Sequence, residues 1–112
     1  MALQSAKVND VFRALADPTR RAILERLARG TAGASALAKP FDMALPSFTQ
    51  HLDILEQSGL VRSMKLGRVR MYKLAPQPLK AAEAWLSRQR RTWDCRLDQL
   101  DSHLLDMKEK AP

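Results

Sequence analysis

Two adjacent stretches decide the fold: PSFTQHLDILEQSG (residues 46–59) and LVRSMKLGRVRMYKL (residues 60–74). In the first, Phe48, Leu52 and Leu55 are spaced four and three residues apart, as on one apolar face of a helix. Its opening proline and closing glycine suit the two ends of a helix. The second stretch holds two short, partly alternating segments around a Leu-Gly pair, a pattern that predicts a β-hairpin with a glycine turn.

Three further helices are expected before residue 46: over residues 5–16, over residues 18–29, and from Ser35 to about Pro40. The first carries apolar residues at i, i+3, i+4 and i+7, the spacing of one helical face. Asp17-Pro18 suits the start of the second, because Asp can cap a helix and proline loses no bond in its first turn. A loop of small residues leads to the third helix, which Ser35 can cap and which must end near its proline.

A long final helix is expected from about Pro78. Its apolar residues follow heptad-like steps: Leu86, Trp93, Leu97, Leu100, Leu104 and Met107. A helix over residues 79–107 is about 43 Å long at 1.5 Å per residue. A domain this small cannot cover so long a stripe, so we expect a second copy of the chain to cover it.

The charge of the chain is strongly basic and unevenly placed. Its 112 residues include 19 Lys and Arg against 12 Asp and Glu, with a formal net charge of +7 and a pI near 10.2. Residues 60–78, which include the expected hairpin, hold five basic side chains and no acidic one. A solvated structural face usually mixes both signs, so this patch predicts a polyanionic partner.

The order of the elements and the charge together predict a winged helix-turn-helix, a mainly α fold with a small β-hairpin. A helix fits the major groove of DNA with its first residues at the base edges, and a basic hairpin beside it reaches phosphates. We expect residues 1–78 to form the DNA-binding domain and residues 79–112 to form a C-terminal dimerisation helix of the same single domain.

Several protein classes are excluded by what the sequence lacks. No apolar run exceeds three residues, so neither a membrane-spanning helix nor a secretory signal is expected, and the protein should be cytoplasmic. The one cysteine, Cys95, can form neither an intrachain disulfide nor a Cys-x-x-Cys pair. Without a Gly-x-Ser-x-Gly motif, a phosphate-binding glycine loop or a carboxylate pair near a histidine, we expect no enzyme and no cofactor.

The stretches FRALADPTRRAILERL, ALPSFTQHLDILEQSGLV and GRVRMYKL resemble the ArsR/SmtB-type winged-helix repressors, from about Val8 to Pro78. The most specific elements are Asp17-Pro18 with Arg20-Arg21, and the run Gln50-His51-Leu52. The resemblance implies a homodimer whose first and last helices pair across a two-fold axis. On this basis the residues expected at the dimer interface are Val8, Phe12, Leu86, Trp93, Leu97, Leu100 and Leu104.

The chain departs from the family pattern where metals bind. Metal sensors of this family carry a Cys-x-Cys before the recognition helix, but the corresponding SALAKPFDM has neither cysteine nor histidine. Asp101-Ser102-His103 resembles the first half of a second family site, and no second half follows it. We therefore expect the branch that lacks metal-sensing ligands, with no metal bound and no effector named by the sequence.

Two other features each allow two interpretations. Cys95 is either a thiol activated by neighbouring arginines for a redox switch or an ordinary thiol, and the second is favoured. Trp85 and Trp93 either line an effector pocket or pack in the dimer, and packing is favoured.

The leading hypothesis is a homodimeric repressor of transcription that binds a two-fold symmetric operator in double-stranded DNA and excludes polymerase sterically, with its own promoter as one candidate. The residues expected to read base edges are Ser47, Thr49 and Gln50, and those expected to bind backbone phosphates are His51, Lys65, Arg68 and Arg70. For His51, packing against the neighbouring helix is the alternative. The second hypothesis is a protein-interaction module on a winged-helix scaffold without specific DNA binding.

Overall fold

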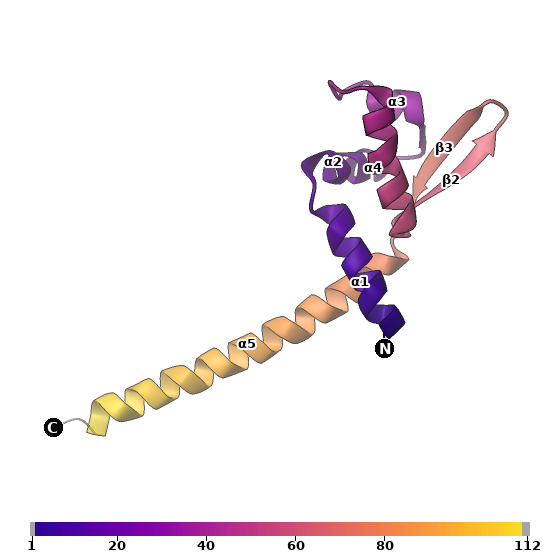
Figure 1. Cartoon of the computed structure of the whole chain (residues 1–112). Coiled ribbons are helices and arrows are strands. Elements are labelled where there is room, and N and C mark those ends of the chain that lie inside the picture. The colour runs from indigo at the N-terminus through magenta and orange to yellow at the C-terminus, as the bar shows by residue number, and fades with distance from the viewer. Residues whose placement is uncertain (1, 111–112) are drawn as a thin grey trace. The chain divides into compact units, whose positions relative to one another are not determined.

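In the computed structural model of the chain, residues 2–110 are described, with only the backbone described for residues 2–6 and 110. The chain divides into two compact units, with the boundary between Ala82 and Glu83. The mainly α fold with a small sheet that the sequence predicts is confirmed. In chain order the elements are α1 (Ala2–Leu15), α2 (Pro18–Leu27), β1 (Ala32–Gly33), α3 (Ala34–Ala38), α4 (Leu45–Gln57), β2 (Val61–Leu66), β3 (Val69–Leu74) and α5 (Gln77–Lys110) (Figure 1).

The start of α2 follows the expected chemistry. Asp17 has extended backbone angles and accepts a hydrogen bond from the backbone N–H of Arg20 at 3.1 Å, with Pro18 in the first turn. The start of α3 does not, because Gly33 precedes the helix and Ser35 lies inside it. The prediction that Ser35 caps α3 is therefore wrong.

The sheet has three antiparallel strands in the order β1, β3, β2, one more than the expected hairpin. The added strand is short: Ala32 pairs with Tyr72 and Gly33 pairs with Met71. A Cβ atom on Gly33 would lie 3.2 Å from a methyl carbon of Val69, which is tighter than ordinary contact. The missing side chain of Gly33 therefore lets β1 lie close to the free edge of β3.

One apolar core joins the elements of the first unit. Its largest fully buried side chains are Val11, Ile23, Leu37, Phe48, Leu52, Leu55 and Val61. The rings of Phe41 and Phe48 meet with their centroids 5.3 Å apart at an interplanar angle of 39°. Because α4 supplies three of the buried side chains, all from one face, the core holds this helix by that face and leaves its other face in solvent.

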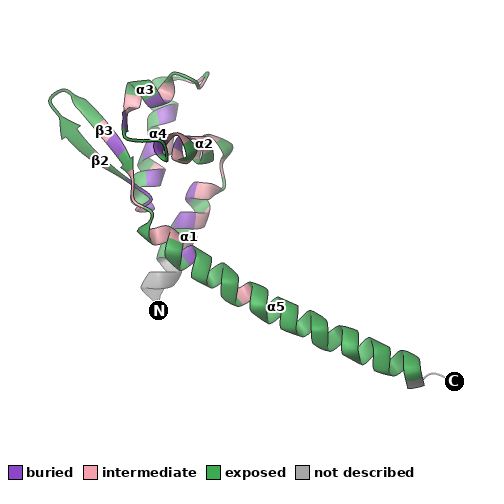
Figure 2. Ribbon diagram, turned by 180° about the vertical axis from the view of Figure 1, so that it is seen from behind, coloured by how far each residue is buried: buried purple, intermediate pink, exposed green. Residues whose placement is uncertain are grey.

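The second unit consists of the rest of α5. Its side chains are exposed along almost its whole length (Figure 2). The large apolar side chains that remain exposed here are Trp85, Leu86, Trp93, Leu97, Leu100, Leu104, Leu105 and Met107. By contrast, Leu79 and Ala82, in the first turns of α5, pack with the core of the first unit.

Candidate nucleic-acid interface

The solvent face of α4 is polar. Ser47, Thr49 and Gln50 are all exposed, as expected for residues that read base edges. The hydroxyl of Thr49 donates to the carbonyl oxygen of Leu45 at 2.9 Å, so its proton is already used within the helix. Thr49 therefore presents a methyl group and acceptor lone pairs, whereas Ser47 and Gln50 make no hydrogen bond to another side chain in the described part of the chain.

The hairpin of β2 and β3, called the wing below, ends in a two-residue turn of Gly67 and Arg68. Leu66 and Val69 form the last pair of the ladder. Gly67 has a φ of +63°, and no residue other than glycine among those described has a positive φ. A glycine at positive φ followed by a residue at negative φ defines a type II′ turn, whose twist matches a hairpin. The turn places the exposed Arg68 at the tip of the wing.

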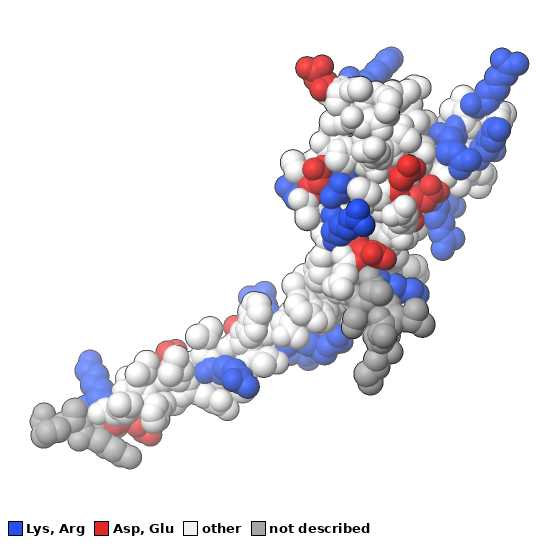
Figure 3. Space-filling view, in the orientation of Figure 1, with Lys and Arg blue, Asp and Glu red and all other residues white. Residues whose placement is uncertain are grey.

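Lysine and arginine side chains gather over the wing (Figure 3). Lys65 and Arg70 are both exposed and lie directly opposite each other on neighbouring strands. Like charges at such a position repel each other and destabilise the pair. A polyanion laid against this face would relieve that repulsion.

The base of the wing is tied to α4 by a short chain of hydrogen bonds. Arg70 donates to the hydroxyl oxygen of Ser63 at 2.8 Å, and that hydroxyl donates to the carboxylate of Glu56. The sequence places no acidic residue within the wing, but the fold brings Glu56 to it from α4. Burial raises the pKa of Tyr72 above its ordinary value, the charge of Glu56 raises it further, and Arg70 opposes the rise.

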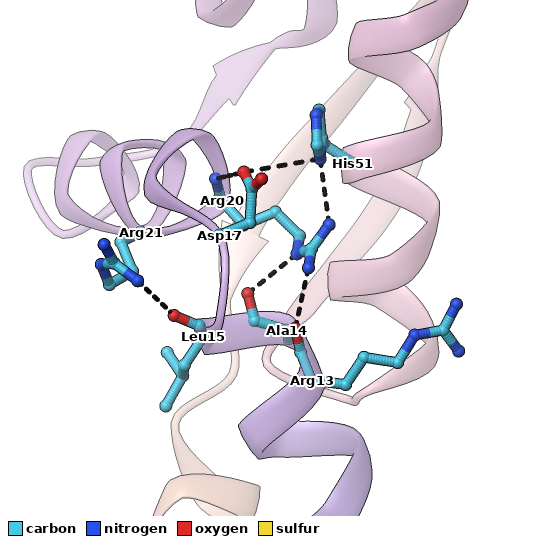
Figure 4. A network of polar contacts seen from close by, with 7 residues as sticks. All are labelled: Arg13, Ala14, Leu15, Asp17, Arg20, Arg21 and His51. Carbon is cyan, nitrogen blue, oxygen red and sulfur yellow. Dashed lines mark hydrogen bonds and ion pairs between the residues drawn. The ribbon is translucent and has the colours of Figure 1, made fainter.

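His51 does not point freely into solvent. Its ring is half-buried, and its Nδ1 atom lies 3.1 Å from Nη1 of Arg20 and 3.7 Å from a carboxylate oxygen of Asp17 (Figure 4). The guanidinium of Arg20 also donates to the carbonyl oxygens of Ala14, at 2.9 Å, and Arg13, at 2.8 Å. These contacts hold the Nδ1 side of the His51 ring against the start of α2, and the phosphate contact expected of His51 stays a prediction.

Arg20 and Asp17 were not among the residues expected at the site. The signal that identifies them is positional: two arginines follow closely after the end of α1, where carbonyl groups lack partners within the helix. The second of them, Arg21, donates to the carbonyl oxygen of Leu15 at 2.7 Å. Together these two arginines donate hydrogen bonds to three carbonyl oxygens at the end of α1, those of Arg13, Ala14 and Leu15.

The pKa of Asp17 is lowered from its ordinary value. Burial works in the opposite direction, but the hydrogen bond from the backbone of Arg20, the positive charge that His51 carries when it is protonated, and the charge of Arg20 outweigh it. The carboxylate is therefore held in its ionised form, in which it accepts best as the cap of α2.

The residues expected at the dimer interface differ in how far they are buried within one chain. Val8 and Phe12 of α1 are half-buried, and Phe12 packs against the core. Leu86, Trp93, Leu97, Leu100 and Leu104 of α5 each leave half or more of their surface exposed.

The residues considered for metal or redox chemistry are exposed on α5: Cys95, Asp101 and His103. Within residues 2–110, no three His, Cys, Asp or Glu side chains gather where they could hold a metal ion. The helices of this same region also include none that is long and apolar enough to span a membrane.

Comparison with known proteins identifies the family. A family model described as a helix-turn-helix domain matches residues 15–63. The chain is 35% identical over 79 residues to the transcriptional repressor SdpR of Bacillus subtilis, across 70% of this chain and 88% of SdpR.

Among solved structures, an ArsR family transcriptional regulator is 54% identical with a TM-score of 0.76, across 80% of this chain and 93% of the other. The homodimeric winged helix-turn-helix DNA-binding domain of Mb0332 from Mycobacterium bovis is 28% identical with a TM-score of 0.64, across 88% of each chain. The fold and these likenesses agree with each other: the chain belongs to the ArsR/SmtB-type family of winged helix-turn-helix transcriptional regulators.

Proposed function

We propose that this chain is a homodimeric transcriptional repressor that binds a two-fold symmetric DNA operator and blocks a promoter sterically. It acts in the cytoplasm and catalyses no reaction. One observation carries the proposal: α4 is fixed to the core by one face while its polar face stands beside a basic wing. SdpR, which is 35% identical, is itself named a transcriptional repressor.

The polar face of α4 supplies sequence specificity in this proposal. The amide of Gln50 can donate to and accept from adenine together in the major groove. Ser47 can bond to a base edge or a phosphate. Thr49, whose hydroxyl proton is used by Leu45, is suited to contact a thymine methyl group.

The wing supplies affinity that does not depend on sequence. Lys65, Arg68 and Arg70 are exposed cations, and each phosphate neutralised releases counterions from DNA. At the tip, Arg68 is the residue proposed to enter the minor groove, whereas Arg70 uses one of its five N–H donors on Ser63 and keeps the others for a phosphate.

Dimerisation is assigned to the apolar stripe of α5 together with Val8 and Phe12 of α1. Residues 1–78 then form the DNA-binding domain, and residues 79–112 form the dimerisation helix. The homodimeric state stated for the Mycobacterium bovis domain supports this assignment. A two-fold dimer requires half-sites about 34 Å apart, one turn of DNA, or a multiple of that spacing.

A protein-interaction module without specific DNA binding is the alternative. Such a module usually presents apolar anchors on one helix face. The solvent face of α4 instead carries serine, threonine and glutamine, which favours DNA.

Selection of bound duplexes from random DNA by the purified protein tests the proposal, because it reports binding, symmetry and half-site spacing together. We expect a palindromic consensus. Gln50→Ala should then cost about 1–3 kcal/mol on the selected operator and much less on scrambled duplex. The matched control is Gln57→Ala, at the exposed end of the same helix.

The contribution of the wing is measured by the salt dependence of binding. Arg68→Ala should weaken binding to both DNAs and reduce the slope of log affinity against log salt by about one. Arg88→Ala, an exposed arginine of α5, is the control and should leave the slope unchanged. If wild type and Gln50→Ala each bound the selected operator and the scrambled duplex with equal affinity, specific recognition would be contradicted.

A further inference from the structure

The side chain of Arg20 joins three helices at one point. It leaves the first turn of α2, donates to two carbonyl oxygens in the last turn of α1, and reaches the imidazole of His51 on α4 (Figure 4). A surface arginine that served only as a phosphate contact would keep these donors free. Here the donors of the guanidinium bind groups within the protein, and the side chain of His51 lies between Arg20 and the proposed DNA-facing surface.

The contact with His51 fixes where the ring carries its proton. A guanidinium donates hydrogen bonds and cannot accept them. At 3.1 Å from Nη1 of Arg20, Nδ1 of His51 must therefore be the acceptor, and it carries no hydrogen. The neutral ring then carries its hydrogen on Nε2.

Nε2 is the ring nitrogen that lies away from Arg20 and Asp17 (Figure 4). In the neutral ring held by Arg20, this side therefore presents an N–H donor rather than a lone pair. A phosphate oxygen accepts hydrogen bonds and offers none, so only this tautomer is complementary to DNA backbone.

We propose that Arg20 is a positioning residue: it holds His51 in the Nε2–H tautomer and aims that N–H at a DNA phosphate. The proposal rests on the proposed DNA-binding function and deepens it, because it assigns the phosphate contact to one atom and its orientation to a residue on another helix. Arg20 itself does not touch DNA.

Two charged groups face His51 from the start of α2, Arg20 and Asp17, and the end of α1 contributes only carbonyl oxygens through Arg20. If the ring gains a second proton, Nδ1–H can no longer accept from Arg20, and the carboxylate of Asp17, 3.7 Å away, is the acceptor within reach. The arrangement with Arg20 therefore belongs to the neutral ring.

The first test is spectroscopic and uses the full-length protein without DNA. Long-range proton–nitrogen NMR correlations distinguish an Nε2–H from an Nδ1–H imidazole, and the chain has only two histidines. With neutral rings, wild-type His51 should show the Nε2–H pattern alone. Arg20→Gln, whose amide can accept as well as donate, should shift His51 toward a mixture of tautomers, while the exposed His103 stays unchanged as an internal reference.

Arg21→Gln is the matched control. Arg21 also donates to a carbonyl in the last turn of α1, at 2.7 Å from Leu15, but it has no contact with His51. A loss of α1 packing would affect both arginine variants, whereas the tautomer of His51 should respond only to Arg20. Unchanged His51 signals in Arg20→Gln would overturn the proposal.

The second test is a double-mutant cycle on the selected operator. His51→Ala and Arg20→Gln should each weaken binding about tenfold, as for a lost hydrogen bond to a charged group. The double variant should lose no more than either single variant, because both changes remove the same contact. With Arg21→Gln in place of Arg20→Gln, no such coupling to His51→Ala is expected.

Additive losses in the Arg20 cycle would show that Arg20 acts independently of His51 and would overturn the proposal. Arg20→Lys keeps the positive charge and is the second variant, in case Arg20→Gln fails to fold. Its thermal unfolding can be compared with that of wild type. A wild-type protein that binds no selected duplex would instead refute the proposed function, and the tautomer measurement would remain interpretable.

Discussion

The proposed dimer depends most on burial of the exposed apolar stripe of α5. Replacing Leu97 and Leu100 by aspartate in the same chain should convert the dimer to monomer. Both leucines are about half exposed, at 57% and 51% of their surface, so neither substitution removes core packing of the first unit. Carboxylates placed in an apolar seam without partners are strongly unfavourable.

The size of the effect follows from the exposed surface. Full burial of a leucine is worth about 1.5–3 kcal/mol, so covering the half still exposed contributes about 1 kcal/mol for each residue. Leu86, Leu97, Leu100 and Leu104 from two copies then contribute about 8 kcal/mol in total. The double variant removes about half of this, which weakens the dimer at least about a thousandfold before the cost of burying charge is added.

Light scattering after size-exclusion chromatography at micromolar concentration measures the change. Wild type should have twice the 12.6 kDa mass of one chain, and the double variant should have that of one chain. Leu105→Asp is the control, because Leu105 is 61% exposed and lies about 100° around the helix from Leu104. A monomeric wild type, or equal dissociation by Leu105→Asp, would refute the assignment of the seam.

Three further outcomes are expected. Phe48→Ala should lower the free energy of unfolding by about 3–5 kcal/mol, because its ring is fully buried against Phe41; a loss below about 1 kcal/mol in urea denaturation would contradict this. Because folding lowers the pKa of Asp17, the stability contributed by its ionised form should be complete above pH 3.8 and lost as the pH falls further. The melting temperatures of wild type and Asp17→Asn should therefore converge in acid. A difference in melting temperature that does not change with pH would contradict this. Equimolar Zn²⁺ should leave the DNA affinity unchanged in fluorescence anisotropy, because SALAKPFDM offers no thiolate or imidazole; release of the DNA by zinc would show a metal site that the sequence does not reveal.

The elements that the sequence predicts well are those set by local spacing. Helix α4 is recognisable from apolar residues at helical intervals, and the wing from a glycine between two short β segments. Their ends differ from expectation by one residue: α4 begins at Leu45, so Pro46 is its second residue rather than its first. Proline is tolerated at either position, which is why the pattern alone does not distinguish them.

The features that sequence reasoning missed depend on contacts between distant segments. Strand β1 is two small residues with no alternating pattern, and it exists only because the edge of β3 is free to pair with it. Likewise, nothing local links Arg20 to His51, 31 positions apart; packing of α2 against α4 brings them together. The DNA-reading roles of Ser47, Thr49 and Gln50 stay predictions, which the proposed selection tests.

The hydrogen-bonded chain from Arg70 through Ser63 to Glu56 has a consequence for the kinetics of DNA recognition. A hairpin attached only at its base can swing, and it would have to become ordered each time it met a duplex. Here the cross-link to the last turns of α4 restricts that motion when the protein folds. Conformational entropy is thus lost before DNA arrives, and the wing meets the phosphates with its cations already oriented.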